Sequence, residues 1–160
     1  MPETDSRELL AQIEAARRKV LDEGRPDAVA KRRALDMMTA RERVAALVDN
    51  GVLREFGSLV EPHHDNELNR DLVAPADGII TGTGRIDGRY VNVLAHDYTV
   101  YGGSSGKIGG FKLARAVQRS IDRGMPVVML LEGGGHRIQD GMNAAHFAGA
   151  SPVFQNMARC

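Results

Sequence analysis

Two neighbouring β-type runs limit the possible folds of this chain more than any other part of its sequence. Residues 78–86 and 90–98 are rich in Ile, Val, Thr and Tyr, and they are joined across Asp87 and Gly88. An Asp-Gly pair between two such runs is the strongest short-range signal for a β-hairpin. We therefore expect an antiparallel hairpin over residues 78–98.

Glycine loops alternate with regular elements after this hairpin. The first loop is expected over 102–110, and apolar residues at helical spacing then predict a helix that ends at Gly124. These residues are Leu113, Ala114, Val117 and Ile121. The unbroken apolar run 127–131 predicts a strand covered on both faces, and three glycines follow it at 133–135. The Ser-Pro pair at 151–152 predicts the start of a further helix.

The first part of the chain is predicted to be helical. Apolar residues recur there at helical spacing between charged ones, which indicates an amphipathic helix that ends near Gly24. They are Leu9, Ile13, Ala16 and Val20. A second helix is expected over 26–38. A third begins at Thr39, where Thr39 and Glu42 have the spacing of a capping box, and Gly51 ends it.

These patterns divide the chain into three stretches. Residues 1–60 form a helical lead-in that ends in a short strand over 52–60. Residues 61–76 are polar, contain two prolines and lack periodicity, which is typical of a loop. Residues 77–160 begin an α/β domain with the order strand, strand, glycine loop, helix, strand, glycine loop, helix.

Two groups of polar side chains are interpreted as non-functional. Basic residues of the lead-in could contact an anionic ligand, but they are interpreted as a solvated or interface-facing surface. They are Lys31, Arg32, Arg33, Arg41 and Arg43. His63, His64 and Asp65 are adjacent in the loop, and adjacent histidines without a spaced partner rarely form a metal site. We predict no metal.

Charge and cysteine content exclude several classes of partner. Lys plus Arg total 21 and Asp plus Glu total 21, so no positive excess exists to neutralise nucleic acid or an anionic membrane. No segment approaches the roughly 20 apolar residues of a membrane helix. The single cysteine, Cys160, excludes an internal disulfide and suits a reducing compartment. We expect a cytoplasmic protein that binds neither nucleic acid nor a membrane.

Both glycine loops stand where a strand leads into a helix. Backbone N–H groups without an intrahelical partner can converge there on an anion or a polarised carbonyl. Glycine lets a substrate approach such groups because it has no side chain. Gly134 and Gly135 are therefore the candidate donors of an oxyanion hole. The same glycines could instead only permit a tight turn against the sheet.

A serine hydrolase is the main alternative from another chemical class. Gly102, Ser104 and Gly106 fit the G-x-S-x-G pattern of a nucleophile elbow, and His96 and His136 could complete a triad. An elbow serine follows a strand of a parallel sheet, however, whereas the strand before Ser104 closes a hairpin. The chain is also short for that fold.

Four stretches carry a family resemblance over roughly residues 39–141. They are Thr-Ala-Arg-Glu-Arg at 39–43 with Leu47 and Asp49, Asp-Gly-Ile-Ile-Thr-Gly at 77–82 through Ile-Asp-Gly-Arg at 86–89, His-Asp-Tyr-Thr-Val-Tyr-Gly-Gly-Ser at 96–104, and Gly-Gly-His-Arg-Ile-Gln-Asp-Gly at 134–141. In this order and spacing they resemble the β-type carboxyltransferase subunits of propionyl-, acetyl- and methylcrotonyl-CoA carboxylases and related decarboxylases. The resemblance implies a crotonase-like (ClpP/crotonase) α/β fold of ββα units behind the helical lead-in.

The resemblance also implies a site. Residues 77–160 would be the start of an acyl-CoA-binding domain, in which the Gly134 and Gly135 amides hold the thioester oxygen as an enolate while the acyl α-carbon exchanges CO₂ with carboxybiotin. Lys107 and Arg137 would be charge partners. The residues implied to line the CoA and acyl pocket are Tyr98, Thr99, Tyr101, Gly102, Gly103, Ser104, Ser105, Gly106, Lys107 and Arg137.

Partners follow from the same resemblance. Biotin would be carried on a partner protein or domain, alongside biotin carboxyl carrier and biotin carboxylase components. A C-terminal carboxyltransferase half, or a separate chain that supplies it, would complete the active site in an oligomer. Because family members are much longer, we expect an incomplete domain that is inactive alone. A non-catalytic binding or assembly module of the same fold is the other alternative.

The chain departs from the family at a few positions. Gly133 stands where the family usually has Ser, and His136 stands where it usually has Ala. Gly109 and Gly110 replace a His-Ala-Glu-like stretch. These changes leave the backbone donors in place, but they leave the acyl group and the direction of the reaction open.

Overall fold

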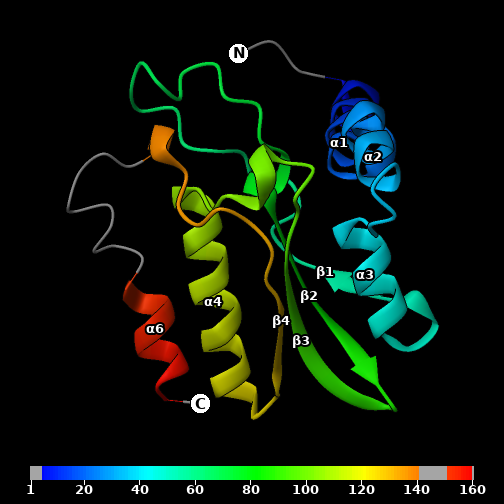
Figure 1. Cartoon of the computed structure of the whole chain (residues 1–160), viewed down its shortest axis with the longest axis vertical. Coiled ribbons are helices and arrows are strands. Elements are labelled where there is room, and N and C mark those ends of the chain that lie inside the picture. The colour runs from blue at the N-terminus through cyan, green and yellow to red at the C-terminus, as the bar shows by residue number, and fades with distance from the viewer. Residues whose placement is uncertain (1–4, 141–150, 160) are drawn as a thin grey trace.

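A mixed four-stranded sheet in the order β1-β2-β3-β4 forms the centre of the computed structural model, which describes residues 5–140 and 151–159. Gly141 and Cys160 lie outside the described residues. The strands are β1 (Arg54–Glu55), β2 (Ile79–Ile86), β3 (Arg89–His96) and β4 (Val127–Leu130). The first three are antiparallel, whereas β4 is parallel to β3. Figure 1 shows α3 (Ala40–Leu47) on one side of the sheet and α4 (Lys107–Arg123) on the other.

Both faces of the central strands are buried, because α3 covers one face and α4 the other. Successive strand residues point in opposite directions, so neighbouring residues pack into different clusters. Ile80, Val93 and Ala95 belong to the core cluster that includes α3. Ile79 and Leu94, each 0% exposed, belong to the cluster that includes α4. The central strands therefore have continuous runs of buried residues, polar Thr81 and Asn92 among them, rather than a strict alternation of buried and exposed positions.

The predicted hairpin is confirmed. β2 and β3 pair from Ile79 opposite His96 to Ile86 opposite Arg89. Asp87 and Gly88 have φ angles of 49° and 77°, and both values are typical of a type I′ turn.

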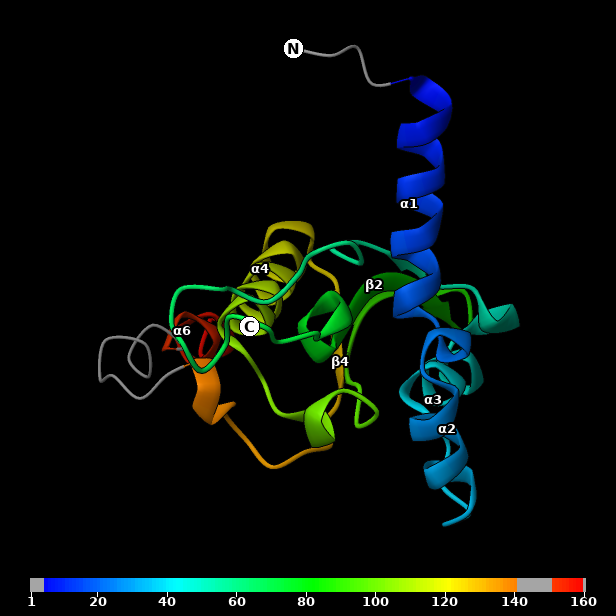
Figure 2. The same cartoon turned by 90° about the horizontal axis from the view of Figure 1, so that it is seen from above.

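Three helices precede the sheet: α1 (Ser6–Val20), α2 (Pro26–Arg33) and α3. The capping box at Thr39 and Glu42 is confirmed. α2 ends five residues before its predicted end at residue 38, because the chain turns at Asp36, which has a φ of 54°. The predicted first helix forms but ends at Val20, and a 3₁₀ turn (Asp22–Gly24) follows it. Figure 2 shows α1 projecting from the body. Its Leu9 and Ile13 side chains are 47% and 42% exposed.

Other predicted boundaries need correction. α3 ends at Leu47, and a 3₁₀ turn (Asp49–Gly51) follows it. The strand expected over 52–60 is only β1, which pairs with Thr83 and Gly82. The loop expected over 102–110 ends at Gly106, because Lys107 already begins α4.

The elements after α4 follow the prediction in part. α4 ends at Gly124, whose φ of 59° is left-handed, as predicted for a helix C-cap. β4 has side chains in both core clusters, as predicted, since Val127 and Met129 pack on the α4 side and Leu130 on the α3 side. Its residues are only half-buried, and within the described residues it pairs only with β3. α6 (Ser151–Met157) begins at the predicted position and packs against α4, where Asn156 donates to the Ala114 carbonyl oxygen at 3.1 Å.

Candidate functional site

The two glycine loops lie at the carboxyl ends of two neighbouring parallel strands. β3 leads into the first loop, 97–106, and β4 leads into the second, 131–140 (Figure 1). Ligands of parallel sheets bind at this end of the strands. The structure therefore brings together the two segments that the sequence singled out.

A short backbone ladder joins the loops. The Ser105 N–H donates to the Gly135 carbonyl oxygen at 2.8 Å, and the Arg137 N–H donates to the Ser105 carbonyl oxygen at 2.8 Å. A Cβ atom at Gly133 would lie only 2.4 Å from the carbonyl oxygen of Gly103. This close approach requires glycine, which gives a physical reason why Gly133 stands where the family usually has Ser.

Gly134 and Gly135 lie exposed in the second loop. Neither backbone N–H donates a hydrogen bond to any of residues 5–140 or 151–159. A Cβ atom at either position would meet no other atom within 4 Å. Unused donors beside open space are what an oxyanion hole requires.

Arg137 lies beneath the loops and is 2% exposed. Its guanidinium pairs with the Asp77 carboxylate and, at 3.4 Å, with Asp140. It also donates to the Ser104 carbonyl oxygen at 3.1 Å, and its guanidinium carbon lies 5.3 Å from the centre of the Tyr101 ring. Arg137 therefore joins the two loops from inside the protein. This differs from the expectation that it faces a ligand as a charge partner.

Asp77 connects this cluster to α4. The side chain is fully buried, and it accepts a hydrogen bond from the Gly109 N–H at 2.6 Å. A Cβ atom at Gly109 would lie 2.9 Å from Cγ1 of Ile79, so glycine lets the first turn of α4 approach Asp77. Burial raises the pKa of the Asp77 carboxyl, and Arg137 opposes that rise.

Lys112 supports the same turn from α4. It is 8% exposed, and its Nζ donates to the Ala76 carbonyl oxygen at 2.9 Å and to that of Ile79. Burial lowers the pKa of Lys112 to about 8. The sequence has no signal for this role, because a lysine on an amphipathic helix is usually exposed.

The N-terminal helices anchor Glu132, which precedes the three glycines. Arg32 contacts its two carboxylate oxygens at 2.8 and 2.9 Å, and Arg43 contacts one of them at 2.9 Å. The Arg32 guanidinium also lies 5.0 Å from the centre of the Tyr98 ring. The interpretation of these arginines as a solvated surface is wrong, because both pair with a carboxylate from the second loop.

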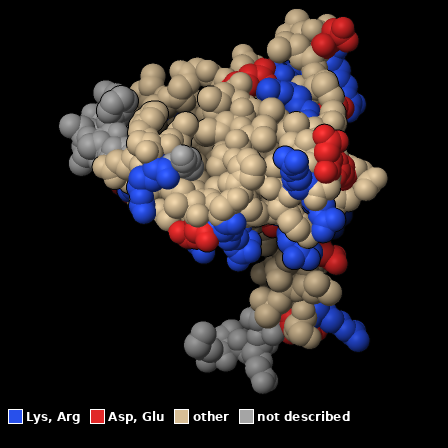
Figure 3. Space-filling model, turned by 90° about the horizontal axis from the view of Figure 1, so that it is seen from below, with Lys and Arg blue, Asp and Glu red and all other residues tan. Residues whose placement is uncertain are grey.

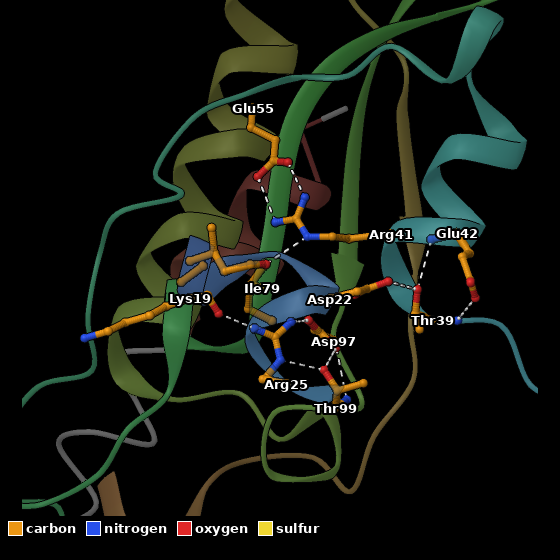
Figure 4. Close-up of polar contacts among 12 residues, drawn as sticks. Lys19, Asp22, Arg25, Thr39, Arg41, Glu42, Glu55, Ile79, Asp97 and Thr99 are labelled. Carbon is orange, nitrogen blue, oxygen red and sulfur yellow. Dashed lines mark hydrogen bonds and ion pairs between the residues drawn. The ribbon is translucent and has the colours of Figure 1, made fainter. Parts of the chain in front are cut away.

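Figure 4 shows further contacts between the lead-in and the rest of the chain. Arg25 pairs with Asp97 at 2.7 Å and donates to Thr99 Oγ1 at 2.9 Å. Arg41 pairs with Glu55 at 2.6 Å. Because Asp97 and Thr99 lie in the first loop, the helices hold both loops in place.

The other residues expected to line a pocket lie along the first loop and the start of α4. Tyr98 and Tyr101 are 47% and 48% exposed. The Lys107 Nζ lies 3.4 Å from the Asp65 carboxylate at the protein surface. Gly102, Ser104 and Ser105 are partly exposed, whereas Gly103 and Gly106 are buried. The two buried glycines face Glu132, Asp77 and Asp140 and serve the packing of the loops.

Ser104 lacks the geometry of a nucleophile elbow. Its backbone is extended, with φ −66° and ψ 137°, and its hydroxyl donates to the Tyr101 carbonyl oxygen at 2.8 Å. An elbow serine sits instead on a strained turn between strand and helix. The strand before Ser104 closes the hairpin, as expected, because β3 is antiparallel to β2, but β3 is also parallel to β4.

The histidines of the long loop have local partners. His63 Nδ1 lies 2.9 Å from Asp65, and His64 Nδ1 lies 2.8 Å from the Asn69 carbonyl oxygen. In the described part of the chain, no three His, Cys, Asp or Glu side chains are grouped to hold a metal ion. No helix among these residues is long and apolar enough to cross a membrane.

The sequence matches the carboxyl transferase domain family over residues 31–160. The carboxyltransferase subunit of propionyl-CoA carboxylase from Haloferax mediterranei is 36% identical over 134 residues, which cover 83% of this chain and 26% of the relative. The methylmalonyl-CoA decarboxylase subunit alpha of Veillonella parvula is 36% identical over 136 residues, which cover 85% of this chain and 26% of the relative. The chain thus spans about a quarter of the length of these relatives.

Solved structures agree with this match. Transcarboxylase 12S with methylmalonyl-CoA bound aligns with a TM-score of 0.85 at 28% identity, over 96% of this chain and 30% of that chain. The beta subunit of P. aeruginosa geranyl-CoA carboxylase aligns with a TM-score of 0.77 at 30% identity, over 94% of this chain and 27% of that chain. The expected crotonase-like α/β fold is confirmed. Because the family match includes the sheet and both glycine loops, the chain belongs to the carboxyl transferase domain family.

Proposed function

We propose that this chain is the acyl-CoA-binding part of a biotin-dependent carboxyltransferase. The observation that carries the proposal is the pair of unused N–H groups at Gly134 and Gly135, beside open space at the carboxyl ends of β3 and β4. The names of the relatives support the substrate class, since they refer to propionyl-CoA and methylmalonyl-CoA.

The two amides would bind the thioester oxygen. When the acyl α-carbon loses a proton or a carboxyl group, negative charge collects on that oxygen as an enolate. Donors that are fixed before the reaction stabilise this charge without reorganisation, and one such donor is worth about 2.7–4 kcal/mol in other enzymes. The direction stays open, because carboxylation and decarboxylation pass through the same enolate.

The first loop would line the CoA and acyl pocket. Its exposed and partly exposed members supply aromatic and hydroxyl groups; they are Tyr98, Thr99, Tyr101, Gly102, Ser104 and Ser105. Lys107, the first residue of α4, would add a cationic group. Gly103, Gly106 and Arg137 are buried, so we assign them the role of holding the loops together. An acyl-CoA would therefore contact the exposed loop residues, whose positions depend on the buried Gly103, Gly106 and Arg137.

Biotin would supply or receive the carboxyl group. The residues described fit the acyl-CoA half of the reaction, because the unused donors suffice for one thioester oxygen. Contacts to biotin would come from a C-terminal carboxyltransferase half or a separate chain. We also propose biotin carboxyl carrier and biotin carboxylase components as partners, an oligomeric assembly, a cytoplasmic location, and no turnover by this chain alone.

Isothermal titration of the purified chain with acetyl-, propionyl- and longer acyl-CoAs tests this function. Gly134→Val is the decisive variant, because Gly134 has no positive φ and a Cβ atom there meets nothing within 4 Å. Valine would thus fit the fold while filling the space beside the donors. We expect saturable binding that weakens by about tenfold or more in Gly134→Val, which corresponds to about 1.4 kcal/mol or more.

Gly110→Ala is the matched control, since its Cβ would also meet no atom within 4 Å but lies on α4. Equal affinity in the two variants would contradict the oxyanion site. A folded chain that binds no acyl-CoA would favour the assembly module. Labelling by a fluorophosphonate that disappears in Ser104→Ala would favour the hydrolase.

A further inference from the structure

A pocket lies at the end of the sheet opposite to the glycine loops. Its volume is about 760 Å³, within the range of roughly 300–1,000 Å³ that is usual for ligand pockets. Tyr90 at the start of β3 and Met125 just before β4 both line it. The pocket therefore adjoins the amino ends of the strands whose carboxyl ends carry the proposed acyl-CoA site.

Arginine dominates the charge of this pocket. Its four arginines come from β1, β2 and α4: Arg54, Arg85, Arg119 and Arg123. Two carboxylates also line it, but both are engaged. Asp49 accepts from the N–H groups of Asp87 and Gly88 at 3.0 and 2.8 Å. Glu55 pairs with Arg41 at 2.6 Å. Figure 3 views this end of the molecule and shows several groups of basic side chains across it.

Three of these arginines have unused hydrogen-bond donors. Across residues 5–140 and 151–159, the side chains of Arg54, Arg119 and Arg123 form no ion pair and donate no hydrogen bond. The Nε of Arg119 is buried without a partner. Its guanidinium carbon lies 5.3 Å from the centre of the Phe56 ring, which keeps the group beside the pocket.

Tyr90 contacts Arg85 within the pocket. Its hydroxyl lies 2.6 Å from the guanidinium of Arg85, whose carbon lies 4.4 Å from the centre of the same ring. The hydrogen bond from Arg85, then the charge of Arg85 and to a smaller extent that of Arg54, lower the pKa of the Tyr90 hydroxyl. A field that favours the tyrosinate anion also favours an anionic ligand.

We propose that this pocket binds a small phosphate-bearing ligand with a flat ring, of the nucleotide class. Guanidinium groups bind phosphate oxygens in pairs and stack on planar rings. Phe56 and Tyr90 add aromatic surface to the pocket, and Tyr90 is 55% exposed. The inference does not depend on acyl-CoA binding at the glycine loops.

Titration of the full chain with ADP, pyrophosphate and adenosine tests the inference. Arg54→Gln/Arg123→Gln removes two charges at exposed positions, where glutamine fits without repacking the core. Arg115→Gln is the matched control, because Arg115 is an exposed arginine of α4 outside this pocket. We expect saturable ADP binding that weakens about tenfold or more in the double variant and less than about twofold in the control, because the double variant removes two charged hydrogen-bond donors from the pocket.

Four outcomes would overturn the inference. They are no saturable ADP binding by a chain that circular dichroism shows to be folded, equal weakening in Arg115→Gln, adenosine binding as tight as that of ADP, and loss of ADP binding in Gly134→Val. The last outcome would place the nucleotide at the glycine loops. Weaker but saturable binding of pyrophosphate would support the phosphate contacts.

Discussion

Lys112 and Arg137 each place a positive charge inside the protein, at 8% and 2% exposure. Arg137 has two carboxylate partners, whereas the hydrogen bonds of the Lys112 Nζ to described residues go to the carbonyl oxygens of Ala76 and Ile79. A buried ammonium without a carboxylate is costly to keep charged, which is why burial lowers its pKa. Both side chains support the turn at Asp77, to which Gly109 also binds.

Lys112 makes stability depend on pH in a specific direction. Because its pKa falls from 10.5 to about 8 on folding, the unfolded chain binds more protons between these pH values. The free energy of unfolding should therefore rise with pH through this window, by on the order of 3 kcal/mol from this residue. Urea denaturation at about pH 8 and about pH 10 measures the rise.

Lys112→Met should lose this contribution, and Lys31→Met should keep it, because Lys31 is exposed on α2. An equal rise in the wild type and Lys112→Met would show that Lys112 is not the group responsible.

At the scale of elements, the first turn of α4 shows how adjacent glycines serve different purposes. A Cβ atom at Gly109 would lie 2.9 Å from Ile79 Cγ1 and 3.1 Å from the Asp77 carbonyl oxygen. A Cβ atom at Gly110 would meet nothing within 4 Å. Gly109 is thus needed for the approach of helix to sheet, whereas Gly110 only lowers helix propensity.

Alanine substitutions at these two positions should change stability in opposite directions. Gly110→Ala should raise the free energy of unfolding by about 0.5–1 kcal/mol, because alanine favours the helix. Gly109→Ala should lower it by about 1–3 kcal/mol through overpacking. Chemical denaturation measures both, and a change of the same sign in the two variants would refute the packing described here.

At the scale of the whole molecule, buried arginines attach the N-terminal helices to the two loops. Arg25 reaches Asp97 in the first loop, and Arg32 reaches Glu132 in the second. Both arginine side chains are less than 15% exposed, unlike the 62% exposed side chain of Arg33, which pairs with Glu42. Removal of one partner from a buried pair costs about 3–5 kcal/mol, whereas an exposed pair is worth less than about 1 kcal/mol.

Limited proteolysis tests this attachment. Arg25→Ala/Arg32→Ala should be cleaved faster within residues 5–38, because Asp97 and Glu132 no longer hold α2 and its preceding turn. Arg18→Ala/Arg33→Ala removes the same number of charges from exposed positions and should be cleaved at the wild-type rate. Equal cleavage of the two variants would mean that the arginines do not fasten the helices.

The sequence by itself determined the local elements and the position of the glycine loops. The turn at Asp87 and Gly88, the cap at Thr39 and the helix end at Gly124 each depend on residues close together in the chain, so their patterns were sufficient. The placement of Gly134 and Gly135 after an apolar strand was visible in the same way.

Only the tertiary structure decided which charged residues are buried and what they hold. Arg32 and Glu132 are 100 residues apart, and Arg137 and Asp77 are 60 apart, so no local pattern connects them. The parallel pairing of β4 with β3 brings the two loops together. Arg32 and Arg137 are buried next to these loops and hold them in place. The physical reason is that burial of a charge depends on partners supplied by packing, whereas turns and caps depend on neighbours along the backbone.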